Sequence, residues 1–236
     1  MSHGPHHRLI DMFSIVIAIH NNESTLKRTL QSFDILDGRL KKEIEVVVVF
    51  DGRDKSCEEI VSEWQSRTSI SNVVLHQAHL GVSSARNYGV RNSSSGWITF
   101  LDADDEILPE RLLAVSSASP FKILIGKQDL VISDIRYLDR PDLISVLAPS
   151  EFHIMSMVLS RKTFDEVGGF DEGFTIGGDW DFIVRARKMG LSIEYSQSFF
   201  VRRYLHSYNS SLDVQEVRKQ QLLAIRKHVQ KSKKDD

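Results

Sequence analysis

The chain has 236 residues, of which 41% are hydrophobic and 26% are charged, a composition that is ordinary for a soluble globular protein with one α/β domain or slightly more. Its formal net charge of −2 argues against nucleic acid as the main partner, because proteins that bind nucleic acid usually carry a basic excess. The single cysteine, Cys57, excludes an internal disulfide and fits a reducing compartment.

No apolar run approaches the roughly 18 residues that a membrane-spanning helix needs. The opening stretch, MSHGPHHRLIDM, lacks the apolar core of a signal peptide, and we assign no metal to its histidines, His3, His6 and His7. These features favour a cytoplasmic location.

Strand and helix patterns alternate in the first half of the chain. Apolar, β-prone runs predict strands at Phe13–Ile19, Ile44–Phe50, Val73–His76 and Trp97–Leu101. The segments between them predict helices from Glu23 or Ser24 through Phe33, at Cys57–Arg67 and at Ser83–Val90. This order requires a parallel sheet with right-handed crossovers.

The alternation is less regular after Pro109. We expect a helix that ends over Leu112–Ser117, a loop or boundary at Asp139–Ser150, an apolar run at His153–Leu159, and helices from Asp179 or Trp180 to Lys188 and over Asp213–Val229. Short strands are expected at Lys122–Ile125, Leu130–Ile135, Ile193–Tyr195 and Phe199–Tyr204.

Three carboxylates, Asp102, Asp104 and Asp105, follow the strand that ends at Leu101, at the edge where open α/β sheets bind ligands. Alternate residues of an extended chain point the same way, so Asp102 and Asp104 can face one pocket. Mg²⁺ and Mn²⁺ prefer oxygen ligands and commonly share them with phosphates, which implies a diphosphate ligand. The alternative is an acidic loop that only caps the next helix, which would begin near Pro109.

Six segments in this order resemble glycosyltransferase family 2 with the GT-A fold: SIVIAIHNNE, VVVVFDGRD, GVSSARNYG, GWITFLDADDEILPERL, VGGFDEGF and GDWDFIVRARKMG. The resemblance implies an α/β, Rossmann-like and mostly parallel central sheet flanked by helices, with a small acceptor-side region and a C-terminal helix. We expect a nucleotide-sugar-binding half at 12–120, an acceptor-side half of the same domain, with the catalytic base, at 121–212, and an amphipathic helix and tail at 213–236.

The resemblance also implies nucleotide contacts. Asp51 would hydrogen-bond the base, most often uracil in this family, and the positive end of the third helix would favour the diphosphate. From residues alone, Arg86 could instead form a surface salt bridge. The residues expected to bind the nucleotide are Ala18, His20, Asn22, Asp51, Gly81, Ser83, Arg86 and Asp102.

The metal and the base are implied in the same way. Mn²⁺ or Mg²⁺ would be held by Asp104, with Asp102 and His206 as further ligands, and Asp179 would take the proton from the acceptor hydroxyl. Asp179 could instead be the N-cap of its helix, and His206 a surface loop histidine. Two positions depart from the family pattern: Phe50 and Gly178 stand where relatives carry acidic residues.

The implied activity is metal-dependent transfer of a hexosyl or N-acetylhexosaminyl group from a nucleotide diphosphate, most often UDP, to a hydroxyl of a glycan or glycolipid, with inversion. A catalytically inactive nucleotide-binding relative and a nucleotidyltransferase are the alternatives. The terminal lysines, among them Lys231 and Lys233, would allow peripheral contact with the inner face of an anionic membrane.

Overall fold

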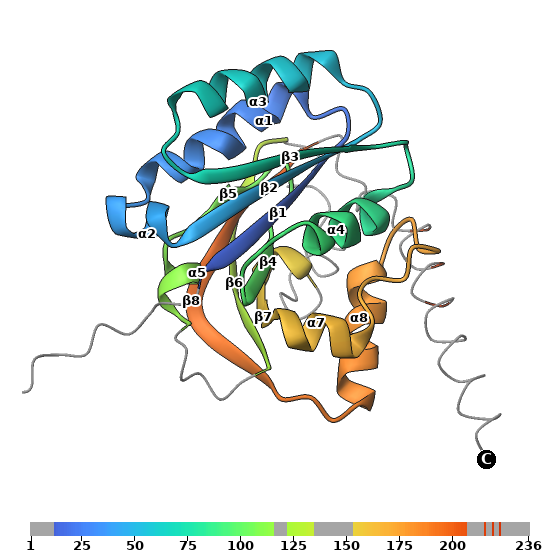
Figure 1. Cartoon of the computed structure of the whole chain (residues 1–236). Helices are drawn as coiled ribbons and strands as arrows, with labels where there is room; N and C mark the ends of the chain where they lie inside the picture. Colours follow the sequence, from blue (N-terminus) through green and yellow to red (C-terminus); the bar gives the residue numbers. More distant parts are fainter. Residues whose placement is uncertain are drawn as a thin grey trace, which may run out of the picture.

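The structure is a computed structural model that describes residues 12–115, 122–134 and 153–206, together with Gln215, Lys219 and Leu222. An eight-stranded sheet with the order β3-β2-β1-β4-β7-β6-β8-β5 forms its centre, and helices cover both faces (Figure 1). The predicted loop at Asp139–Ser150 lies outside the described residues. So do the N-terminal histidines, the terminal lysines and nearly all of the predicted helix at Asp213–Val229.

The first half of the sheet is parallel, as predicted from the alternation of elements. Its strands are β1 (Phe13–Ile19), β2 (Ile44–Asp51), β3 (Ser71–Gln77) and β4 (Trp97–Phe100). The central strand β1 pairs in parallel with both β2 and β4. Every residue of β2 is buried, which explains why the five residues Val46–Phe50 are all apolar rather than alternating with polar ones.

Helices α1 (Glu23–Gln31) and α3 (Lys55–Arg67) pack together on one face of the parallel strands, and α4 (Val82–Arg91) lies on the other (Figure 1). The predicted helix through Phe33 continues α1 as a 3₁₀ turn, η1 (Ser32–Ile35). The short helix α2 (Gly38–Lys42) was not predicted. Its N-cap, Asp37, accepts hydrogen bonds from two backbone amides, and so short a helix leaves little periodic pattern.

The second half of the sheet is mixed. Strand β7 (Met157–Ser160) runs antiparallel to β4 and to β6 (Ile123–Ile132), whereas β8 (Ile193–Leu205) runs parallel to β6. The prediction of four short strands here is wrong, because β6 and β8 are each continuous. A register shift between Ile125 and Lys127 interrupts the pairing and masks the continuity in the sequence. The edge strand β5 (Glu106–Ile107) is antiparallel to β8.

Short helices connect these strands. They are α5 (Glu110–Leu113), the 3₁₀ turn η4 (Ile154–Ser156), α7 (Arg161–Val167) and α8 (Gly178–Lys188). We predicted that a helix ends over Leu112–Ser117, but α5 already ends at Leu113. The sequence interpretation missed α7, although Ser160 caps its start by accepting from the Thr163 amide.

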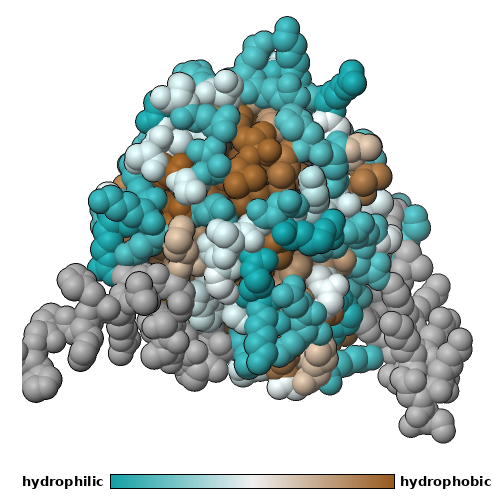
Figure 2. Space-filling view, viewed as in Figure 1, coloured by the Kyte–Doolittle hydropathy of each residue, from teal (hydrophilic) through white to brown (hydrophobic). Residues whose placement is uncertain are grey.

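The large side chains of Trp64 and Trp97 are both buried in the core. One sheet edge remains more open: β3 pairs only with β2 among the described strands, and Figure 2 shows an apolar area over this edge. None of the described helices has the length and apolar character needed to cross a membrane.

Gly126 lies at the register shift of β6, where an added Cβ would stand 2.2 Å from the Phe200 ring. Since Phe200 is fully buried, the ring cannot move away without disturbing the core. We expect Gly126→Ala to lower the free energy of unfolding by about 1–3 kcal/mol, measured by chemical denaturation. Gly96→Ala is the matched control, because nothing lies within 4 Å of its added Cβ. Equal stabilities of the two variants would contradict this packing.

Candidate functional site

The acidic loop, residues 101–105, begins where β4 ends. Carboxylate oxygens of Asp102, Asp104 and Asp105 lie within 4.8 Å of one another. The Leu101 amide donates to the Val16 carbonyl oxygen at 3.0 Å, so the loop leaves the sheet beside β1. This spacing of oxygen donors fits a hard divalent cation, as the sequence predicted.

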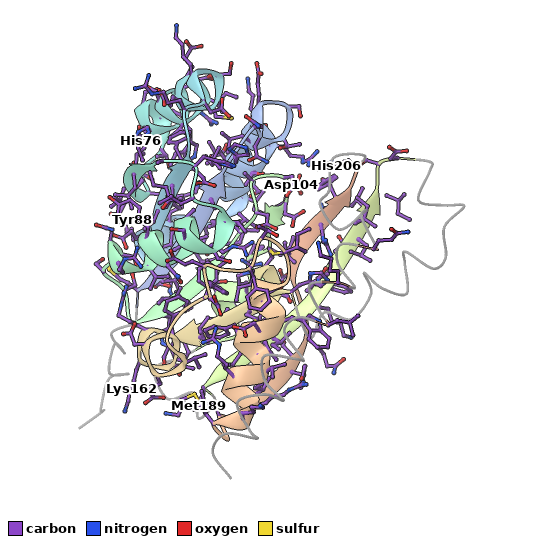
Figure 3. All side chains as sticks on the ribbon, turned by 90° about the vertical axis from the view of Figure 1, so that its right-hand side faces the viewer. His76, Tyr88, Asp104, Lys162, Met189 and His206 are labelled. Carbon is purple, nitrogen blue, oxygen red and sulfur yellow. The ribbon has the colours of Figure 1, made fainter. Side chains whose placement is uncertain are left out.

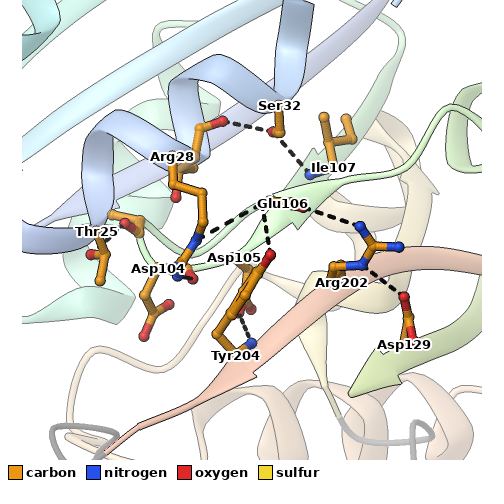
Figure 4. A network of polar contacts seen from close by, with 12 residues as sticks. Thr25, Arg28, Ser32, Asp104, Asp105, Glu106, Ile107, Asp129, Arg202 and Tyr204 are labelled. Atoms are coloured by element: carbon orange, nitrogen blue, oxygen red, sulfur yellow. Dashed lines mark hydrogen bonds and ion pairs between the residues drawn. The ribbon is translucent and has the colours of Figure 1, made fainter. Parts of the chain in front are cut away.

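Helix α1 holds the backbone of this loop. The Thr25 hydroxyl donates to the Ala103 carbonyl at 2.9 Å, and the Arg28 guanidinium donates to the Asp104 carbonyl at 2.6 Å (Figure 4). Arg28 also lies 3.5 Å from the ring centroid of Tyr204, whose hydroxyl donates to Glu106. The sequence interpretation missed these residues. Their only local signal is that Thr25 and Arg28 are three apart and therefore share one helix face.

Asp105 is a buried member of the loop, with 1% of its surface exposed. Burial raises the pKa of its carboxyl well above the usual value, and the charges of Asp104 and Asp102 raise it further. Its Oδ1 accepts the Tyr204 amide at 3.1 Å, which ties the loop to β8. Asp105 therefore supports the loop, whereas Asp102 and Asp104 are only partly buried.

The end of β8 brings His206 to the loop. Its Nε2 lies 3.0 Å from Asp104 Oδ2, and Figure 3 shows the two residues side by side. The neighbouring arginines make contacts within the protein: Arg202 pairs with Asp129 at 2.8 Å, and Arg203 lies 3.3 Å from His153 Nε2. The structure thus joins the predicted ligands Asp104 and His206 although they are 102 positions apart.

Helix α4 carries Arg86 to the same place. Its Nη2 lies 2.7 Å from Asp102 Oδ1, with 11% of the Arg86 side chain exposed, so the contact is no surface salt bridge. Gly81 precedes the helix at φ +94°, a conformation that favours glycine. The Ser83 hydroxyl donates to the Phe174 carbonyl at 3.3 Å.

Asp51 at the end of β2 is held by amides. Its Oδ1 accepts from the Leu80 amide at 2.7 Å and from Gln77 Nε2 at 2.9 Å, and its Oδ2 accepts from the Gly81 amide at 3.0 Å. His20 Nδ1 lies 2.8 Å from the Asp51 carbonyl oxygen. The Asp51 carboxylate thus already holds the loop before α4, and the predicted contact with the nucleobase would be made by this same carboxylate.

Three other predicted positions complete this region. Ala18 is partly buried near the end of β1 and packs against the core, and the Asn22 side chain accepts the His20 amide at 2.8 Å. Phe50, which replaces an acidic residue of the family pattern, is buried and stacks on His76 with ring centroids 4.9 Å apart. An apolar packing role explains this departure.

Asp179 lies in the first turn of α8. The N-cap is Gly177, so the alternative that Asp179 is the cap is wrong. Burial raises the pKa of the Asp179 carboxyl, the positive charge of Arg86 lowers it, and the charge of Asp102 raises it. Asp179 therefore interacts electrostatically with both members of the Asp102–Arg86 pair. A carboxylate with a raised pKa is suited to accept a proton.

Gly178 lies close to Ser83, which leaves little room for a side chain at this position. A Cβ at this position would lie 2.8 Å from the Ser83 hydroxyl oxygen. The acidic side chain found in relatives would therefore displace Ser83 from its bond with Phe174. In the same turn, Asp181 is buried and pairs with Arg185 at 2.8 Å. Arg185 also donates to the Gly169 carbonyl, so this pair links α8 to the loop at Gly169.

Arg111 braces the strand end that carries the acidic loop. It is fully buried, donates to the Phe100 carbonyl at 2.8 Å, and bonds the Met155 carbonyl of η4. Burial lowers its pKa, and the charge of Asp105 opposes this. Its position 11 residues after Phe100 gives no sequence signal for this contact.

We expect Arg111→Ala to lower the free energy of unfolding by about 2–5 kcal/mol, because it removes a fully buried side chain and leaves the Phe100 and Met155 carbonyl oxygens without their donor. Guanidinium denaturation measures the change. The control is Arg91→Ala, since Arg91 is exposed and its pair with Glu172 at 3.9 Å should contribute less than about 1 kcal/mol. Similar small losses in both variants would contradict the bracing role.

Comparison with known proteins gives one family. The family described as Glycosyl transferase family 2 matches residues 14–174. Glycosyltransferase GlyA of Streptococcus pneumoniae is 25% identical over 185 residues, which are 75% of this chain and 25% of that protein. The amylovoran biosynthesis glycosyltransferase AmsB of Erwinia amylovora is 28% identical over 201 residues, which are 75% of this chain and 64% of that protein.

A solved structure supports the fold. Residues 1–349 of TarS from Staphylococcus aureus, in complex with UDP-GlcNAc, superpose with a TM-score of 0.67 at 17% identity, covering 86% of this chain and 61% of that chain. The chain therefore spans only part of these relatives, and the predicted GT-A fold is confirmed. Because the family match extends over well over half of its residues, the chain belongs to glycosyl transferase family 2.

Proposed function

We propose that the chain transfers a sugar from a UDP-sugar to an acceptor hydroxyl, with inversion and with Mn²⁺ or Mg²⁺. The observation that supports this most directly is the convergence of Asp102 and Asp104, Arg86 and Asp179 beside the carboxyl end of β4, with Arg86 bonded to Asp102 and electrostatically coupled to Asp179. Family membership and the UDP-GlcNAc complex of TarS favour this donor class.

Asp104 and His206 would hold the metal, with Asp102 as a further ligand or as a contact of the ribose. Their donor atoms suit the proposed ions, because carboxylate oxygens are the preferred ligands and an imidazole nitrogen is also accepted by Mn²⁺. The bound metal would supply Lewis-acid stabilisation of the departing diphosphate.

The nucleotide would lie across the ends of β1 and β2. Ala18, His20 and Asn22 would border it, and Asp51 would contact the base. The amides of the first turn of α4, after Gly81 and including Ser83, would favour the diphosphate. Arg86 would orient Asp102 and add a positive charge near the phosphates.

Asp179 would act as the general base. Its raised pKa makes the carboxylate a better proton acceptor than an ordinary aspartate, and the influence of the Arg86 charge on it supports a role beside the donor site. It would accept the proton from the acceptor hydroxyl as that oxygen attacks the anomeric carbon.

The two halves of the chain would have different roles. Residues 12–120 would hold the donor, and residues 121–212 would supply the acceptor side and the base, with a glycan or glycolipid as the acceptor class. Residues 213–236 would form the amphipathic helix and tail, in contact with a membrane face.

A donor screen tests the proposal. The protein is incubated with Mn²⁺ and UDP-glucose, UDP-galactose, UDP-GlcNAc or UDP-GalNAc, with and without simple glycoside acceptors, and released UDP is measured by chromatography. We expect UDP release from one donor, and its acceleration by an acceptor. Binding of UDP without turnover of any donor would contradict catalysis and favour an inactive relative, for which the replacement at Gly178 is the structural argument.

A further inference from the structure

We propose that His20, Asp51 and His79 form a second cation site, selective for Zn²⁺ and apart from the acidic loop. These three residues come from the ends of β1 and β2 and from the segment after β3. One donor atom from each lies within 4.8 Å of the other two. The His20 and His79 rings stack with centroids 4.2 Å apart and planes at 25°, so both imidazoles stand over the Asp51 end of the strand.

The spacing fits a zinc ion. His79 Nδ1 lies 3.3 Å from Asp51 Oδ2, and His20 Nδ1 lies 2.8 Å from the Asp51 carbonyl oxygen. Zinc ligands at about 2.0–2.1 Å in tetrahedral arrangement stand about 3.3–3.4 Å apart. The separation of His79 Nδ1 and Asp51 Oδ2 therefore matches that of two ligands of one ion. For His20 to become the third ligand, its ring turns out of the stack with His79 and exchanges the bond of Nδ1 to the Asp51 carbonyl, or that of Nε2 to Asn21 Nδ2 at 3.1 Å, for the metal.

The carboxylate is already oriented. The Leu80 and Gly81 amides and the Gln77 side chain all donate to Asp51, which fixes the direction of its remaining lone pairs. Ligands that are held by such outer hydrogen bonds bind metals more tightly, because less order is lost on binding.

The charge balance also favours a cation. Asp51 is 4% exposed, and the one ion pair that it makes among the described residues is with His79, which carries a charge only when protonated. A buried carboxylate with mainly neutral partners gains from a divalent ion. The two histidines are exposed, so the ion has access from solvent.

Ligand chemistry separates the two sites. Two imidazole nitrogens beside one carboxylate suit Zn²⁺, whereas the acidic loop offers mainly carboxylate oxygens, with His206 as its single imidazole, and suits Mg²⁺ or Mn²⁺. Zinc would occupy the residues that we assign to the nucleotide, and this consequence rests on the proposed function. Zinc and UDP would then exclude each other, and zinc would inhibit sugar transfer by occupying the part of the donor site that we assign to the nucleobase.

The test is calorimetric titration of the full chain with ZnCl₂, without nucleotide, in a background where His3, His6 and His7 are replaced by alanine. His79→Phe keeps a ring for stacking but removes the ligand, and we expect about 100-fold weaker zinc binding at this site. His76→Phe is the control, because His76 also stacks on an aromatic ring but lies outside the cluster. Asp104→Ala should retain zinc at this site. Unchanged zinc affinity in His79→Phe would overturn the proposal.

Two additions keep the outcomes distinct. Circular dichroism confirms folding, and if His79→Phe is unfolded, His20→Phe replaces it with the same expectation. The titration is then repeated with saturating UDP and Mg²⁺, and we expect zinc binding at this site to be lost. Zinc binding that depends on His79 but persists with UDP bound would support the zinc site and would contradict our placement of the nucleobase at Asp51.

Discussion

Replacing Asp104 by alanine should weaken metal-dependent UDP binding by about 100-fold or more, because the variant loses the carboxylate that would hold the cation. The fold should be unaffected. The charge of Asp104 acts unfavourably on buried Asp105, and the bond from Arg28 goes to the backbone of residue 104, which alanine keeps. Calorimetric titration with UDP, with and without Mn²⁺, measures the effect.

Asp165→Ala is the control for this variant. Asp165 is exposed on α7 and is not part of the acidic cluster. Its UDP affinity should equal that of the parent chain. If Asp104→Ala bound UDP and Mn²⁺ as the parent does, the acidic loop would not be the metal site.

Replacing Asp179 by asparagine should lower the rate of transfer by about 10²- to 10⁴-fold and leave UDP binding unchanged, since the amide cannot accept the proton of the acceptor hydroxyl. Asparagine has nearly the same shape, so α8 should keep its first turn. Initial rates at saturating donor measure the first quantity, and titration measures the second. Asp165→Asn serves as the matched control.

The pH profile gives a separate check on Asp179. Burial raises the pKa of its carboxyl above the ordinary value of 3.8, so the basic form is populated only at higher pH than for an exposed aspartate. Transfer should therefore fall on acidification at a pH above that ordinary value, and Asp179→Asn should lose this limb. A variant with unchanged rate and an unchanged acid limb would show that another group takes the proton.

The parallel half of the fold could be predicted because its signals are local. The run Ile44–Phe50 is apolar except for Glu45, as expected of a strand that is buried on both faces, and every residue of β2 lies in the interior. In β6 and β8 the partly exposed positions and the register shift near Gly126 divided each strand into two apparent ones. Pairing across the sheet, which no local pattern records, makes them continuous.

The residues of the candidate site could also be predicted only where their signal is local or where the family resemblance supplied it. Asp102 and Asp104 could be identified because they follow one strand directly, and the positions of Arg86, Asp179 and His206 came from the family resemblance. The supports of the loop could not be identified: Arg28 reaches Asp104 across 76 positions, and Arg111 reaches Met155 across 44. Such contacts depend on how helices pack against the sheet, and an isolated arginine in a helix looks the same whether it is buried or solvated.

The measurement that tests the account most directly is calorimetric titration of the parent chain with UDP, GDP, CDP and dTDP, each with and without Mn²⁺. The account predicts that UDP binds, and that it binds only when the metal is present. Equal binding with and without Mn²⁺, or tighter binding of another nucleotide, would contradict the assignment of the acidic loop and of the UDP-sugar donor.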